Sequence, residues 1–486
     1  MRPPGARPGR ATRPGRAVWP GRAAARLVGL IGATALALLA LPGAVLGHQF
    51  GGLFESPLPL PVYLAGAAAA VALSFAIVFV RDVRPPGPGD PRPRAVPAWL
   101  RAGLRLLGVS AVGWVVAQGI VGGGSDGDVG VLFLWIYGWV GVALVSALVG
   151  PVWTWLDPFT TLFDVGAWIV RRLGIAGWAP APYPAGLGRA PAAAGYAAFV
   201  WLELIVTGGG GGRILVGAFL AYLAITLLGM AQFGRDSWRA RAEVFSVWFG
   251  LLGRIAPIVL AGPPEAGLVR RRQFGAGLLE AGWARADVTL AALGVAGVLY
   301  DGLSQTQLWY DTVGLTGITG GTLTLAVFLG VAVLLALGVA RLVAGSSGPA
   351  VGIAAVGAGL VPIATGYMAG HYLAFLLIDG QKILIALGDP FLQGWNLGGL
   401  AFFTPNSAWL PPGLVWAVQL AAVVGGHMLG AVAGHVAAAR DLDAGSTGAL
   451  RSLRLRQLPL AVFMIALTAT TLWSLGQSIV AVKPGG

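Results

Sequence analysis

Residues 362–381 read PIATGYMAGHYLAFLLIDGQ, an apolar segment that carries a single histidine, His371. About 20 residues of this character, rising 1.5 Å each along a helix, match the hydrocarbon thickness of a bilayer. An ionisable side chain inside such a segment is costly unless it faces a partner or a cavity. The stretch therefore predicts a membrane-spanning helix and marks His371 as a candidate functional residue.

The whole chain has the same character as this segment. It is 56% hydrophobic and 10% charged, with a mean hydropathy of +0.78, which is more apolar than soluble globular proteins are. These values predict an all-α fold, a polytopic transmembrane helix bundle with about 10–11 spans of roughly 20 residues each. After a first apolar run, we expect spans at 62–80, 104–121, 129–149, 192–206, 214–233, 288–303, 322–343, 350–378, 414–439 and 460–482.

Two apolar segments do not fit this pattern of spans. Residues 151–170 are rich in tryptophan and broken by a proline, which favours an interfacial or re-entrant piece. The run 244–252 is short and lies within an arginine-rich section, so we expect it to lie along the membrane surface.

The net charge of +13 comes from arginines in the N-terminal tail and in short loops between apolar runs. Cytoplasmic loops of membrane proteins carry this excess, so the arginines indicate a cytoplasmic N-terminus and place loops 122–128 and 379–413 outside. The pattern predicts a multi-pass protein of the bacterial plasma membrane, with the lipid bilayer as its surroundings. It gives no support for a nucleic-acid partner.

The chain divides into three parts. Residues 1–26 hold interleaved Arg, Pro, Gly and Ala without apolar periodicity, which predicts a disordered basic cytoplasmic tail. Residues 27–47 are either a signal peptide or a first transmembrane helix. Residues 48–486 form the transmembrane helical domain. If the chain is cut before His48, that histidine would offer its amine and imidazole to a metal.

Three ionisable residues fall in the outer part of separate expected spans, namely Glu203, Asp301 and His371. His427 lies deeper, near the middle of its span. The chain has no cysteine, so any metal must be bound by histidine, carboxylate or water. We therefore expect Glu203, Asp301 and His371 to share an outward-facing catalytic pocket that, with His427, could bind a divalent metal ion. Alternatively, each residue only hydrogen-bonds a neighbouring helix or reaches water.

Several motifs resemble those of polytopic bacterial membrane proteins labelled fenitrothion hydrolase. They are DPFTTLFD at 157–164, WLEL at 201–204, FGRDSW at 233–238, FSVWFGLLGRIAP at 245–257, YDGL at 300–303, GHY at 370–372, and GH at 426–427 with His435. The resemblance implies a membrane-bound hydrolase of organophosphorus triesters that takes a small apolar substrate from the bilayer. A transporter or channel with an intramembrane carboxylate and histidine relay is the alternative.

Overall fold

The computed structural model describes residues 60–80, 89–90, 92–121, 126–174, 179–440 and 455–476. Within these residues, nine helices are long and apolar enough to cross a membrane, and a tenth apolar segment, Ala190–Val206, is shorter. The prediction of an all-α transmembrane bundle is confirmed. The expected tail 1–26 and the segment 27–47, with His48, lie outside the described residues.

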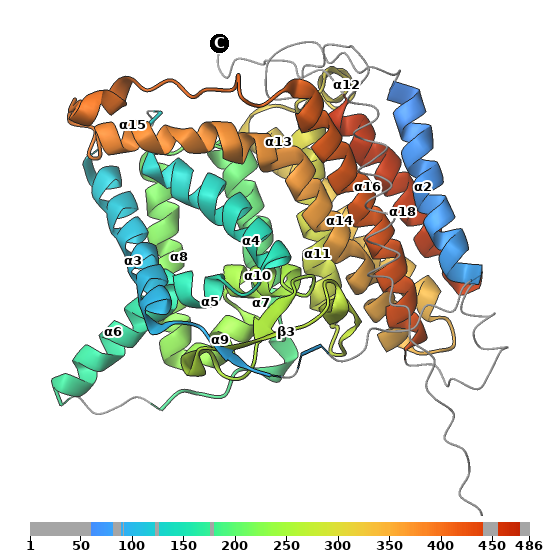
Figure 1. The fold of residues 1–486 in the computed structure, drawn as a ribbon, viewed down its shortest axis with the longest axis horizontal. Coiled ribbons are helices and arrows are strands. Elements are labelled where there is room, and N and C mark those ends of the chain that lie inside the picture. Colours follow the sequence, from blue (N-terminus) through green and yellow to red (C-terminus); the bar gives the residue numbers. More distant parts are fainter. Residues whose placement is uncertain are drawn as a thin grey trace, which may run out of the picture.

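The long helices follow the expected spans closely. They are α2 (Leu60–Val80), α3 (Ala98–Val121), η1 (Val131–Val142) continued by α4 (Ala143–Leu148), α8 (Gly212–Phe233), α11 (Arg285–Ser304), α13 (Gly317–Ala344), α14 (Pro349–Ile378), α16 (Pro412–Ala439) and α18 (Leu458–Leu475). The shorter segment consists of α7 (Ala190–Trp201) and η3 (Leu202–Val206). In Figure 1, α2, α14, α16 and α18 form one side of the bundle and α3, α6 (Pro158–Arg172) and α8 the other.

The helix that carries His371, α14, packs against α16 through glycines. A Cβ atom at Gly426 would lie 2.6 Å from the carbonyl oxygen of Pro362, and one at Gly430 would lie 2.4 Å from that of Gly359. Only glycine permits two helix backbones to approach this closely. The spacing of four residues repeats at Gly434, which approaches Ala355 in the same way. The contact fixes the position of α14 and hence of His371.

Two segments of the bundle have π-helical geometry. One is η1 and the other is η3, which contains Glu203. Aromatic contacts join them, because Trp135 and Trp139 of η1 both pack on Phe199, which lies one turn before η3. Since π-helical turns are rare and concentrate at functional sites, this geometry directs attention to Glu203.

The short helix α10 (Val244–Leu252) corrects one expectation. It does not lie along the membrane surface but is inserted among the spans, where Trp248 is fully buried. The Trp248 ring stacks on Trp139 at 5.9 Å and contacts Tyr196 at 4.9 Å, measured between ring centroids. These aromatic partners bury more apolar area than the bilayer surface would, which explains the position of α10.

The arginine-rich end of the bundle also contains a small sheet that the sequence did not predict. Strands β1 (Arg94–Ala95), β3 (Leu268–Arg271) and β2 (Ile258–Leu260) pair antiparallel in the order β1-β3-β2. Near this end lie α5 (Trp153–Leu156), α6 and α9 (Arg235–Arg241). The opposite, arginine-poor end carries α12 (Gln307–Thr312) and α15 (Ile383–Gly388) (Figure 1). Short 3-10 turns occur at 185–187, 264–266, 276–279, 379–382 and 397–402.

Candidate functional site

Asp301 and His371 meet at the arginine-poor end of the bundle. The Nε2 atom of His371 donates a hydrogen bond to Oδ2 of Asp301 at 3.0 Å, so α11 and α14 are joined here. The Tyr372 hydroxyl donates to the same oxygen at 2.8 Å, and Gln305 Nε2 donates to Oδ1 at 2.7 Å. Both oxygens of Asp301 thus accept from fixed donors, an arrangement that suits an ionised carboxylate.

The pair is not completely enclosed by the described residues. The side chains of His371 and Asp301 are 10% and 14% exposed, respectively. His371 lies seven residues before the end of α14, which places it about 10 Å below that end at 1.5 Å per residue. The pair is therefore close to the arginine-poor surface and not at the centre of the bilayer.

Glu203 faces this pair from a third helical segment. It lies within electrostatic range of Asp301. One turn away, a Cβ atom at Gly297 would lie 3.2 Å from the side chain of Val200, so α7 and α11 are in close contact there. Glu203 itself is buried, at 8% exposure, and within the described residues its carboxyl group makes no hydrogen bond or ion pair.

A tyrosine near Glu203 also has a buried polar group without a hydrogen-bond partner among the described residues. The hydroxyl group of Tyr196 is buried, has no hydrogen-bond partner among the described residues, and lies within electrostatic range of Glu203. Tyr196 precedes Glu203 by seven residues, so both lie on the same face of the segment. Buried polar groups without partners cost free energy comparable to a lost hydrogen bond or more. Within the described residues, the hydrogen-bonding capacity of these two buried groups is therefore unused.

We call Asp301, His371, Tyr372, Gln305, Glu203 and Tyr196 the Asp301 cluster. Three of the four predicted site residues belong to it. The sequence analysis missed Tyr372, Gln305 and Tyr196, although simple signals were present. Tyr372 follows His371 directly, and Gln305 comes one helical turn after Asp301.

His427 does not belong to this cluster. Gly370 packs beside Gln419 of α16, and His427 lies eight residues further along that helix, about 12 Å deeper. Its Nδ1 atom is 2.8 Å from the carbonyl oxygen of Val423, and its Nε2 atom is buried without a partner among the described residues. His427 is therefore an isolated polar group in the interior.

The described residues do not fit a metal ion in this arrangement. They contain no group of three or more His, Asp or Glu side chains placed to hold one. The donors His371, Tyr372 and Gln305 already take three of the roughly four acceptor positions of the Asp301 carboxylate. We therefore derive no chemistry from a metal.

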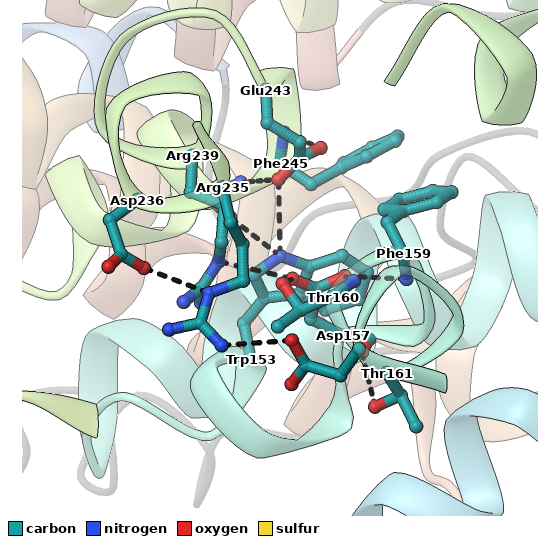
Figure 2. Close-up of polar contacts among 12 residues, drawn as sticks. Trp153, Asp157, Phe159, Thr160, Thr161, Arg235, Asp236, Arg239, Glu243 and Phe245 are labelled. Atoms are coloured by element: carbon teal, nitrogen blue, oxygen red, sulfur yellow. Dashed lines mark hydrogen bonds and ion pairs between the residues drawn. The ribbon is translucent and has the colours of Figure 1, made fainter. Parts of the chain in front are cut away.

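A second cluster of buried charges, drawn in Figure 2, lies where α6 and α10 begin. Asp157 caps α6 by accepting hydrogen bonds from the backbone N–H groups of Phe159 and Thr160. Glu243 caps α10 in the same way and also accepts from the Tyr222 hydroxyl at 2.6 Å. Figure 2 shows Arg239 between the two acids, with its Nε atom 3.2 Å from Oδ2 of Asp157.

Burial and the nearby Glu243 charge raise the pKa of Asp157 to about 6, and Arg239 and the Thr160 hydrogen bonds offset part of this rise. We call Asp157, Thr160, Arg239, Glu243 and Tyr222 the Asp157 cluster. Its carboxylates are occupied by helix caps and side-chain donors. The cluster links α6, α8, α9 and α10, and its role is therefore structural.

Comparisons of the chain with family models, with curated proteins and with solved structures find no match.

Proposed function

We propose that the protein is a membrane-embedded hydrolase whose active site is the Asp301 cluster, open to the outer side of a bacterial plasma membrane. One observation carries the proposal. Two buried groups that have no hydrogen-bond partner among the described residues, the Glu203 carboxyl and the Tyr196 hydroxyl, adjoin a fixed and partly exposed Asp301–His371 pair. The proposed orientation rests on the arginines, whose excess at one end favours a cytoplasmic location for that end.

The proposed chemistry begins with a water molecule between Glu203 and Tyr196. Glu203 is the general base that takes one proton of this water as its oxygen attacks an electrophilic centre. Asp301 is a positioning residue, since it fixes the ring of His371 through the Nε2 hydrogen bond. His371 is partly exposed, and Gln305, the exposed member of the cluster, lies at its edge, where an entering substrate meets it first.

For the substrate we propose a small, apolar organophosphorus triester, in keeping with the family that the motifs at 201–204, 300–303 and 370–372 resemble. Attack of water on phosphorus forms a new P–O bond, and the bond to the aryloxy group breaks. The proton held by Glu203 is then released with the products, a phosphodiester and a phenol. Substrates of this class partition into lipid and can approach the cluster from the bilayer.

The test is hydrolysis by the purified protein in phosphatidylcholine vesicles. A neutral aryl phosphotriester that releases a nitrophenolate serves as the probe. We expect Glu203→Gln to lower the rate at least 100-fold, the usual contribution of a general base, and His371→Ala and Asp301→Asn to lower it as well. Glu280→Gln is the matched control, since that side chain is 52% exposed at the other end. Hydrolysis that is absent from the wild type, or unchanged in Glu203→Gln, would refute the proposal.

A proton transporter is the second candidate, and one observation favours it. Ser474, Thr471 and Thr468 are fully buried on one face of α18, at intervals of three residues. Ser474 lies beside Gly302, next to Asp301 in the chain, so buried hydroxyl groups continue inward from the cluster. In the same vesicles, a transporter dissipates an imposed pH gradient and Glu203→Gln does not, whereas the hydrolase leaves the gradient intact.

A further inference from the structure

The distal half of α6 is exposed although it is apolar. The first turn of α6 is buried, with Phe159 in the core, but from Val165 onward the helix projects away from the bundle (Figure 1). Val165, Trp168 and Ile169 are 50%, 53% and 44% exposed, and Leu173, just after the helix, is 68% exposed. Such a contiguous apolar patch marks an interaction surface.

The most exposed apolar side chains of this helix share one face, while Val170, at 39% exposure, lies away from it. At 100° per residue, Val165, Trp168 and Ile169 point in similar directions, and Arg172 completes the series i, i+3, i+4, i+7. Ala167 lies on the opposite face, and Asp164, one turn before Trp168, borders the apolar face. The end of α6 is therefore amphipathic, with an aromatic ring of the type that concentrates at membrane interfaces.

Two unpaired positive charges end this helix. Arg171 and Arg172 form its last turn, and within the described residues neither makes an ion pair. The guanidinium group of Arg172 lies over the Trp168 ring, 5.4 Å from its centroid. The nearest acid along the helix, Asp164, is already paired with Arg235 at 2.9 Å. The free end thus has two cations available for an external anion.

The α6 patch continues the lipid-facing surface of the bundle. The helix contacts both α3 and α8. α3 exposes Leu106 and Leu107, at 69% and 55%, and α8 exposes Leu228 at 69%. These two helices are candidate membrane spans, so their exposed apolar faces meet acyl chains. An apolar face that adjoins theirs at the arginine-rich end lies at the level of the headgroups.

We propose that the end of α6 is a lipid-binding element, with Val165, Trp168 and Ile169 inserted among acyl chains and Arg171 and Arg172 bound to phosphate groups of anionic lipids. Arg172 extends along the Trp168 ring to reach the headgroup region, as basic side chains near membrane interfaces do. An arginine near an anionic membrane surface contributes about 1 kcal/mol, or roughly a fivefold change in an equilibrium constant. A zwitterionic lipid carries no net negative charge to balance the two arginines.

The absence of cysteine from the chain makes a direct test possible. Ile169→Cys and Ala167→Cys introduce single labelling sites on opposite faces of α6. The full-length protein carries a fluorophore at one site and is placed in vesicles of phosphatidylcholine, with or without phosphatidylglycerol. We expect lipids brominated in their acyl chains to quench the label at 169 and a water-soluble quencher to reach the label at 167.

The anionic lipid is tested separately. Phosphatidylglycerol should increase the fraction of protein in which the label at 169 is buried in lipid. The double substitution Arg171→Ala, Arg172→Ala should remove this increase, because each arginine contributes roughly a fivefold change in the equilibrium constant for insertion. Equal access of water to both labels would overturn the proposal, and so would a phosphatidylglycerol effect that survives both substitutions. Disulfide cross-linking between copies through position 169 would identify a second copy as the partner instead.

Discussion

The Asp157 and Asp301 clusters each combine an aspartate, a glutamate and tyrosine, but they differ in how many hydrogen-bond donors their carboxyl groups have. In the Asp157 cluster, Glu243 is fully buried and accepts from two backbone N–H groups and the Tyr222 hydroxyl. In the Asp301 cluster, Asp301 is equally well satisfied, yet its neighbour Glu203 has no donor among the described residues. The first pattern holds helices together, whereas the second leaves a position for chemistry.

The largest effect is expected from breaking the satisfied cluster. Glu243→Ala removes the acceptor of the Phe245 and Ser246 N–H groups and of Tyr222. It also leaves buried donors unpaired, which should lower the free energy of unfolding by about 3–5 kcal/mol. Unfolding in mixed micelles measures the change. Glu265→Ala is the control, since that side chain is 49% exposed and should change stability by less than about 1 kcal/mol. Equal losses in the two variants would contradict the structural role of Glu243.

A smaller loss of stability is expected from separating α14 and α16, the helix pair that positions His371. Gly430→Ala places a Cβ atom 2.4 Å from the Gly359 carbonyl oxygen, so α16 and α14 must separate. We expect a loss of ~1–3 kcal/mol in unfolding free energy. Because α14 carries His371, hydrolysis should fall as well. Gly425→Ala is a matched control, as a Cβ there meets nothing within 4 Å. If Gly430→Ala behaves like Gly425→Ala, the close approach is not required.

Much of the fold and part of the Asp301 cluster can be predicted from the sequence. Hydropathy gives the spans because each must match the bilayer, and the observed α2, α8 and α14 begin and end within two residues of the expected limits. Depth along the spans indicated that Glu203, Asp301 and His371 share one end. Depth also placed His427 further inward, and about 12 Å separates it from the Asp301 cluster, so including it among the candidate metal ligands was wrong.

The remaining errors have a common cause. The nine residues of α10 are too few to span a bilayer and too apolar for water, so their sequence does not distinguish burial from surface attachment. The choice depends on partners distant in the chain, Trp139 and Tyr196. The β1-β3-β2 sheet was missed for the same reason, since two-residue β1 exists only through its pairing with β3.

A smaller effect is expected in the pH dependence of stability, to which Asp157 contributes. Since the pKa of Asp157 is raised to about 6, the folded protein binds this proton more tightly than the unfolded chain does. The resulting stabilisation is complete below the ordinary pKa, about 3.8, and is lost as the pH rises through about 6. Asp157 thus makes the protein more stable at about pH 5 than at about pH 7. Asp157→Asn should reduce this difference in melting temperature, and Asp164→Asn, whose side chain is 35% exposed, should preserve it. A difference unchanged in Asp157→Asn would assign the pH dependence elsewhere.

The smallest effect on stability is expected at the residue most important for the proposed activity. Glu203→Gln replaces a buried carboxyl group that has no donor among the described residues, so no hydrogen bond seen there is lost, and the burial of a charge is avoided. We expect the unfolding free energy to stay within about 0.5 kcal/mol of the wild type, or to rise. The matched substitution Glu243→Gln should destabilise the protein clearly, because it disturbs an acceptor already engaged by backbone and tyrosine donors. Unfolding of both variants in the same micelles makes the comparison. A functional residue is expected to be dispensable for stability but required for hydrolysis. A large loss of stability in Glu203→Gln would instead make Glu203, like Glu243, a structural carboxylate.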